Sequence, residues 1–199
     1  MKQLLSKSIR FSIGIAVITF VLAAIFTIVS TLMLNGVQWG IGMLIVLFIV
    51  FVGIFFDMLG IAATAADETP FHAMASKKIN GAKHAMLITR NADRFASFCN
   101  DVIGDISGII SGTATAIVLI QLTTGLGYNE DSSFHYTTSV IFTSIVAALT
   151  VGGKAFGKSI AIKYSTDIIF HVGQLFYLIE DKLNIKILPG KKESKIRSR

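Results

Sequence analysis

Four long apolar segments constrain the fold of this 199-residue chain more than any other feature. A helix needs about 20 mainly apolar residues to cross a lipid bilayer. Only 15% of the residues are charged and 53% are hydrophobic, whereas soluble domains are about 25% charged. We therefore predict an all-α polytopic membrane protein with four transmembrane helices, at about residues 11–34, 40–66, 96–122 and 137–155.

Basic residues predict the orientation of these spans. Lysines and arginines gather near the N-terminus, in the loop at 67–95 and after residue 157, whereas the loops at 35–39 and 123–136 contain none. The positive-inside rule thus places both termini on the cytoplasmic side of an inner or plasma membrane. These clusters also account for the formal charge of +6, and no RNA- or DNA-binding motif is present, so no nucleic-acid partner is predicted.

A single helical domain, residues 1–183, is predicted to contain all four spans. Within it, cytoplasmic helices are expected at 70–88 and at 158–183, and the second is amphipathic because its apolar residues recur every three or four positions. This juxtamembrane helix is expected to lie against membrane lipids or to pack beneath the bundle. Residues 184–199 are typical of a basic cytoplasmic tail that contacts anionic lipid.

Three aspartates lie inside the predicted spans. Asp57 interrupts the second span, and Asp101 and Asp105 are four residues apart, on one face of the third. At about 1.5 Å per residue, Asp57 and Asp105 lie about 15 Å from the inner ends of their helices, near the membrane midplane. A carboxylate there costs about 2.5–3.5 kcal/mol, so it needs a cation, a proton, a basic partner or water.

Oxygen ligands suited to a divalent cation gather in the same two spans. Hard divalent ions prefer oxygen, and the candidate metal ligands are Asp57, Asp101, Asp105, Asn100, Thr64 and Thr113. The alternative is structural: the aspartates are protonated or hydrogen-bonded within the bundle, because burial and mutual repulsion raise carboxyl pKa values. Lys154, at the end of the fourth span, could pair with an aspartate, but we expect it to extend to the inner interface.

Small residues accompany the aspartates on both spans. Gly53 and Gly60 flank Asp57, and the third span carries glycines at four-residue spacing, Gly104, Gly108 and Gly112. Such stripes allow close approach of a second helix. They predict tight packing of the bundle and favour a homodimer.

Three elements of the second span and the following loop match motifs of one membrane-protein family. The segment FFDMLGIA, residues 55–62, corresponds to an FFSASE-type motif in the first helix of that family. Gly81 and Ala85 match a Gly-x-x-x-Ala element. The segment NADR, residues 91–94, corresponds to an NPDR-type entry to the next helix.

Two further elements complete the match. Asp101 and Asp105 have the spacing of paired asparagines in the family, and GKAFGKSIA, residues 153–161, corresponds to its GE-x-x-PK-x-x-A element. Over residues 55–183 the chain thus resembles the transmembrane domain of the CorB/CorC and CNNM (cyclin M) magnesium transport proteins. No CBS-pair domain, which usually follows in that family, is expected.

The resemblance implies a magnesium site and a homodimer. The positions that hold the ion in that family fall on Asp57, Asp101, Asp105 and Lys154. Aspartates thus replace a serine and both asparagines, and a lysine replaces the glutamate. The resemblance also implies alternating exposure of the site, with Na⁺ or H⁺ as the coupling ion.

The predicted function is transport or binding of a divalent cation at a midplane site of Asp57, Asp101 and Asp105, and Mg²⁺ is the first candidate for that cation. One alternative is a non-transporting scaffold or regulatory subunit for another membrane or cytoplasmic protein, with the aspartates protonated or paired with Lys154. Another is proton-coupled transport of a different solute, since aspartates titrate. No nucleophile–base set, phosphate loop or zinc motif is present, so no enzymatic activity is predicted.

Overall fold

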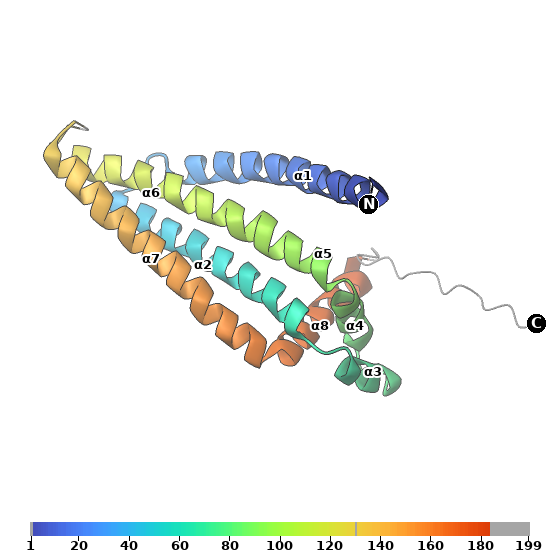
Figure 1. Ribbon diagram of the computed structural model, residues 1–199. Coiled ribbons are helices and arrows are strands. Elements are labelled where there is room, and N and C mark those ends of the chain that lie inside the picture. Colours follow the sequence, from blue (N-terminus) through green and yellow to red (C-terminus); the bar gives the residue numbers. More distant parts are fainter. Residues whose placement is uncertain (1, 130, 184–199) are drawn as a thin grey trace, which may run out of the picture.

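The computed structural model describes residues 2–129 and 131–183, and within them it contains helices and no strand (Figure 1). Four helical segments are long and apolar enough to cross a membrane: Ile9–Leu34, Trp39–Ala65, Ala92–Gly125 and Ser133–Lys163. These segments confirm the predicted all-α fold with four candidate transmembrane helices. The predicted basic tail at 184–199 lies outside the described residues.

The helices follow one another with short connections. In chain order they are α1 (Lys2–Leu34), α2 (Trp39–Ala65), α3 (Thr69–Ser76), α4 (Ala82–Arg90), α5 (Ala92–Ala96), the π-helix η1 (Ser97–Gly104), α6 (Asp105–Gly125), α7 (Ser133–Lys163) and α8 (Ser165–Leu183). The segments α5, η1 and α6 form one continuous rod, which is the third of the four spans.

The centre of the bundle is α2, which lies between α6 and α7 (Figure 1). One cluster of its core joins Val46 and Val50 of α2 to Val118 of α6 and Val146 of α7. The outer helix α1 contacts α6 and η1, and most of its large apolar side chains stay exposed. Exposure of this kind is expected of a helix whose outer surface meets lipid rather than protein.

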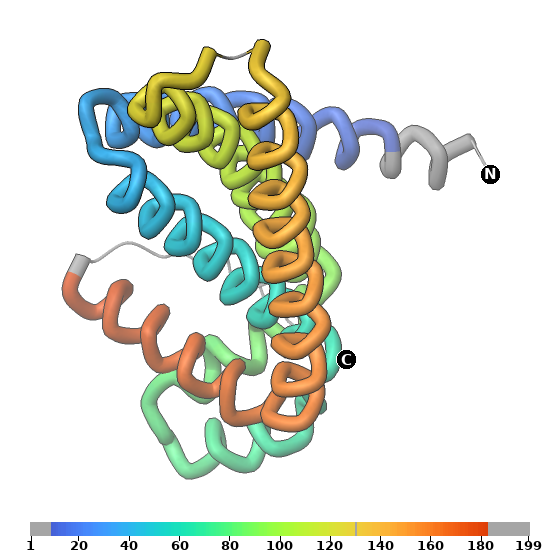
Figure 2. The backbone as a smooth tube through the Cα atoms, turned by 90° about the vertical axis from the view of Figure 1, so that its left-hand side faces the viewer, coloured from blue at the N-terminus to red at the C-terminus, as the bar shows by residue number. Residues whose placement is uncertain are grey.

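The helices α3, α4 and α8 form a layer across one end of the bundle, here termed the α8 end (Figure 2). Phe71, Ile88 and Ile169 of this layer are buried against small residues of α2 and α7. The backbones of α4 and α8 approach closely, because a Cβ built on Gly173 would lie 2.6 Å from the carbonyl oxygen of Gly81. The juxtamembrane helix therefore packs beneath the bundle, which was one of its two predicted locations.

Two predicted boundaries were wrong. The fourth span does not end at residue 155 but continues as α7 to Lys163, so the helix predicted over 158–183 begins only at Ser165. The physical reason is packing: Gly157 and Ala161 are buried, Gly157 against Met58 of α2, and this contact extends α7 by two turns.

The helix predicted over 70–88 is two helices instead of one. Between α3 and α4 the backbone takes positive φ values at Lys78 (56°) and Gly81 (85°). A right-handed helix cannot pass through such residues, so the chain turns there. The turn brings α4 back against α8, where His84 Nε2 lies 2.8 Å from Glu180 Oε2.

Candidate functional site

Lys154 lies between the aspartates of two other helices. Its Nζ atom is 3.6 Å from Asp57 Oδ1 and 3.8 Å from Asp105 Oδ1. The three side chains come from α7, α2 and α6, so the group joins all three central helices. The expectation that Lys154 extends away from the aspartates to the inner interface was wrong, because its ammonium lies within 4 Å of two of them.

Glycines permit this convergence. Gly53 of α2 lies against Ser107 of α6, and a Cβ built on Gly53 would be 2.8 Å from Ser107 Cβ. Gly153 of α7 fits against the Ile54 side chain in the same way. Small residues at these contacts allow the helix axes to come close enough for a lysine to reach two carboxylates.

The π-helix η1 determines which aspartate reaches the lysine. It ends at Gly104, directly before Asp105, and π-helical turns within α-helices occur frequently at functional sites. In a π-helix the hydrogen bonds run from i to i+5, so residues four apart no longer lie one above the other. Asp105 accordingly contacts Lys154, while Asp101 is exposed and forms no ion pair with another described residue.

The remaining predicted ligands are used elsewhere. The hydroxyl of Thr64 donates to the Ile61 carbonyl at 2.9 Å, and that of Thr113 donates to the Ile110 carbonyl at 3.0 Å. The Asn100 side chain packs on Gly60 of α2, and its Oδ1 is buried without a hydrogen-bond partner among the described residues. Of the predicted set, Asp57 and Asp105 thus share the Lys154 ammonium, Thr64 and Thr113 donate within their own helices, and Asp101 is exposed.

The site therefore consists of two carboxylates and one ammonium group, with a formal charge of −1 when all three are ionised. Asp57 is largely buried, with 16% of its side chain exposed, and Asp105 is open at 68%. Within the described part of the chain, no group of three or more His, Cys, Asp or Glu side chains could hold a metal ion. A cation could use Asp57 and Asp105 only in competition with Lys154.

The distances from Lys154 indicate loose pairing. Charge-assisted hydrogen bonds between an ammonium and a carboxylate are about 2.7–2.9 Å long. The two distances from Lys154 Nζ, 3.6 and 3.8 Å, exceed the upper end of that range by at least about 0.7 Å. The ammonium is close enough for electrostatic attraction, and the geometry leaves it free to move without breaking a short hydrogen bond.

A different set of charges ties the α8 end together. Arg90 Nε donates to Glu68 Oε1, and His72 Nε2 lies 2.8 Å from the same oxygen. Burial raises the pKa of Glu68, but Arg90 and His72 outweigh that effect, so the pKa lies below its ordinary value of 4.5. The pKa of nearby Asp67 is also lowered, because its carboxylate accepts hydrogen bonds from the Thr69 N–H and hydroxyl.

The sequence-based prediction did not include Lys154 among the site residues. A usable signal was present: Gly153, Gly157 and Ala161 recur at four-residue spacing, which favours a packed helix that continues past the predicted end of the span. Lys154 would then have been placed inside the bundle and not at its edge.

Comparison with family models, with curated proteins and with solved structures finds no match to this chain. The resemblance to the CorB/CorC and CNNM transmembrane domain therefore stays a prediction that rests on motif order and spacing.

Proposed function

We propose that this chain is a membrane cation transporter in which Lys154 is an internal counter-ion that the transported cation displaces. The observation that supports this proposal is the position of the Lys154 ammonium between Asp57 and Asp105, at 3.6 and 3.8 Å. Intramembrane ionisable residues are expensive, and they commonly mark ion paths or proton relays.

The proposed exchange balances charge. With Lys154 in place, the two carboxylates carry one uncompensated negative charge. If Mg²⁺ binds both carboxylates and Lys154 withdraws, the carboxylate pair and the ion together are neutral. A lysine stem is long and flexible, so its ammonium can move toward the α8 end when it leaves the site. Mg²⁺ is the first cargo to test because of the family resemblance, and Na⁺ or H⁺ is the proposed coupling ion.

We also propose that the α8 end faces the cytoplasm and that two copies of the chain associate. The basic loop and both predicted cytoplasmic helices lie at the α8 end. The α6 face beside Asp105 is open, since a Cβ built on Gly108 or Gly112 would meet nothing within 4 Å. A second copy on this face would cover Asp105, which a single copy would expose to lipid at a considerable cost.

Cysteine cross-linking in native membranes tests the homodimer. Ile109 and Val151 are matched probes, because each is 68% exposed, one on α6 and the other on α7. In a Cys99→Ser background, Ile109→Cys should form disulfide-linked dimers on oxidation and Val151→Cys should not. Equal cross-linking at both positions, or none at either, would contradict the proposed interface.

A second candidate function is a non-transporting scaffold, and one observation favours it. Lys154 already compensates Asp57, so the group could serve only to hold α2, α6 and α7 together. Under that reading the bundle would present its surface to another membrane or cytoplasmic protein.

Flux in liposomes separates these functions. Purified protein would be reconstituted with a magnesium-sensitive dye inside, and flux followed under Na⁺ and pH gradients. We expect Mg²⁺ flux in the wild type, loss of flux in Asp57→Asn and Asp105→Asn, and retained flux in Asp101→Asn, the matched control outside the ion-pair group. Absence of flux in the wild type under every gradient would reject the transporter and favour the scaffold.

A further inference from the structure

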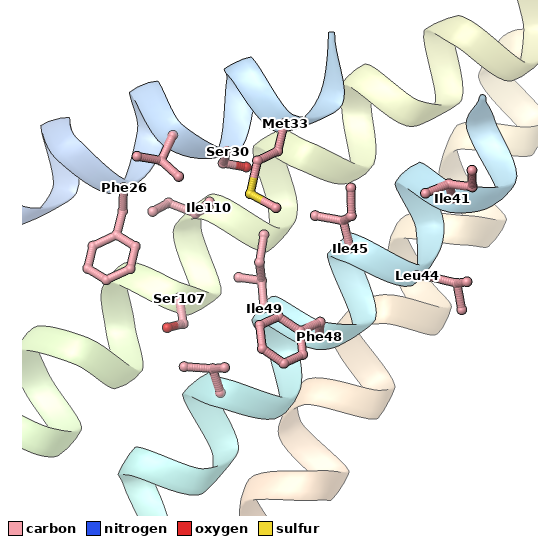
Figure 3. Close-up of a pocket in the computed structure, with 12 residues that line it drawn as sticks. Phe26, Ser30, Met33, Ile41, Leu44, Ile45, Phe48, Ile49, Ser107 and Ile110 are labelled. Atoms are coloured by element: carbon pink, nitrogen blue, oxygen red, sulfur yellow. The ribbon is translucent and has the colours of Figure 1, made fainter. Parts of the chain in front are cut away.

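A cavity of about 340 Å³ lies between α1, α2 and α6, on the side of the bundle away from α7 (Figure 3). Its walls are almost entirely apolar and include Phe26 and Met33 of α1 and Ile45 and Phe48 of α2. Because these helices are candidate membrane spans, the surroundings of the cavity are hydrocarbon. Any occupant must therefore enter from the lipid phase.

Two serine hydroxyls line the cavity without a partner. Ser30 of α1 is 7% exposed and Ser107 of α6 is 8% exposed, and neither forms a hydrogen bond with a described residue. Buried hydroxyls in transmembrane helices usually donate to a carbonyl one turn earlier in their own helix. In α6 this holds for Ser111, which donates to the Gly108 carbonyl at 2.9 Å, and for Thr115, which donates to the Ser111 carbonyl at 2.6 Å.

The packing keeps the cavity open. The helices α1 and α2 are joined by a short turn at 35–38, and α1 packs on α6 and η1 more than on α2. The floor is fixed where Gly53 of α2 lies against Ser107. The space between the two walls begins near the turn. It ends beside Ser107, about 20 Å deeper, because Gly53 lies 14 helical steps beyond Trp39 at about 1.5 Å each.

We infer that this cavity binds one acyl chain of a phospholipid, with the Ser30 hydroxyl donating to its ester carbonyl oxygen. A volume of 340 Å³ lies at the lower end of the usual range for small-molecule sites, about 300–1,000 Å³, which suits a single chain. A carbonyl oxygen only accepts hydrogen bonds, so it matches a hydroxyl that lacks an acceptor. This site is independent of the proposed transport function.

Ser30 is placed for a phospholipid. It lies four residues before the end of α1, about 6 Å from the turn, within reach of the ester carbonyl of a phospholipid whose headgroup lies at that surface. Ser107 lies deeper, beyond the reach of that carbonyl. A free fatty acid would have to place its carboxyl group deep in the bilayer to reach Ser107, at a considerable cost.

Competitive photolabelling tests the inference. The full chain in phosphatidylcholine liposomes would be exposed to palmitate with a diazirine in its chain and, separately, to phosphatidylethanolamine with the same diazirine acyl chain. We expect one saturable label per chain, on peptides that contain Phe26 or Phe48, displaced by the unlabelled form of the same lipid. Loss of one hydrogen bond should weaken labelling about two- to tenfold.

Variants test the hydrogen bond and provide the controls. Weakened phosphatidylethanolamine labelling in Ser30→Ala supports the inference, whereas palmitate labelling that weakens in Ser107→Ala, with phosphatidylethanolamine labelling unchanged in Ser30→Ala, would identify a fatty acid and overturn it. Ser111→Ala removes a hydroxyl that already has a partner in α6, so labelling should not change. Phosphatidylethanolamine labelling that is spread over all exposed helices and is not displaced, or that is unchanged in Ser30→Ala, would also overturn the inference.

Discussion

Two carboxylate–cation groups in this molecule share the same chemistry and differ in their surroundings. At the α8 end, Arg90 donates directly to Glu68, and half of the Arg90 side chain is exposed to solvent. Within the bundle, Lys154 lies 3.6 Å from Asp57, with 27% and 16% of these side chains exposed. The shorter contact lies where water is present, and the longer one lies inside the candidate spans.

The length of the contact alone does not tell which of these two groups contributes more to the stability of the fold. A surface ion pair contributes little, because water solvates both charges when the pair breaks. A pair inside a membrane has no such alternative, so removing one partner leaves an uncompensated charge. The loosely paired Lys154 should therefore matter more to the fold, and to any ion path, than the closely bonded Arg90.

The largest effect is expected from Lys154→Met, which keeps most of the stem and removes the charge. We expect a loss of about 3–5 kcal/mol, the usual result of leaving a buried charge without its partner. Because Cys99 is buried, a thiol-reactive dye can follow unfolding in detergent. Arg90→Met is the control at the α8 end and should have a much smaller effect.

A double variant sharpens that result. If the loss arises from an unpaired carboxylate, Asp57→Asn combined with Lys154→Met should recover most of the stability, because the buried carboxylate is then removed and the remaining one, Asp105, is 68% exposed. Additive losses in the double variant would show that Lys154 acts through packing and not through its charge.

The next effect concerns the glycine contact that brings Asp57 and Asp105 together. Gly53→Ala places a methyl group against Ser107 Cβ, which cannot move away without shifting α6. Overpacking of this kind costs about 1–3 kcal/mol. Gly152→Ala, on the exposed side of α7 where a Cβ would meet nothing within 4 Å, should cost nothing, and equal losses of Tm in the two variants would contradict the assigned contact.

The smallest effect is a pH dependence at the α8 end. Because the folded pKa of Glu68 is lowered, its contribution to stability is present above the ordinary value of 4.5 and is lost as the pH falls through the lower folded value. Arg90→Met should reduce the fall in Tm between pH 6 and pH 3. Arg94→Met, an exposed arginine without an ion pair to a described residue, should keep the wild-type profile.

Hydropathy and periodicity were sufficient to predict the spans and to place Asp57 inside the second of them. The length of an apolar run is a local property, and the bilayer thickness fixes what it can form. The same local rules could not predict the π-helix η1, because the wider turn is stabilised by contacts with α2, such as Asn100 on Gly60, that lie far apart in sequence.

The position of Lys154 depends on tertiary packing in the same way. A lysine near the end of an apolar run is normally an interfacial anchor. Only the packing of Gly157 and Ala161 on α2 extends α7 and so moves Lys154 inside the bundle. The break between α3 and α4 was missed for a related reason, since Lys78 adopts a positive φ that its residue type does not favour.

The most direct test of the account is the affinity for Mg²⁺ with and without the competing ammonium. Isothermal titration of the purified protein would compare the wild type, Lys154→Met and Lys158→Met, the last being an exposed lysine one turn further along α7. We expect Lys154→Met to bind Mg²⁺ at least about tenfold more tightly, a gain of about 1.4 kcal/mol, and Mg²⁺ to restore its Tm. Lys158→Met should match the wild type. Unchanged or weaker binding by Lys154→Met would contradict the claim that Lys154 occupies the cation's place.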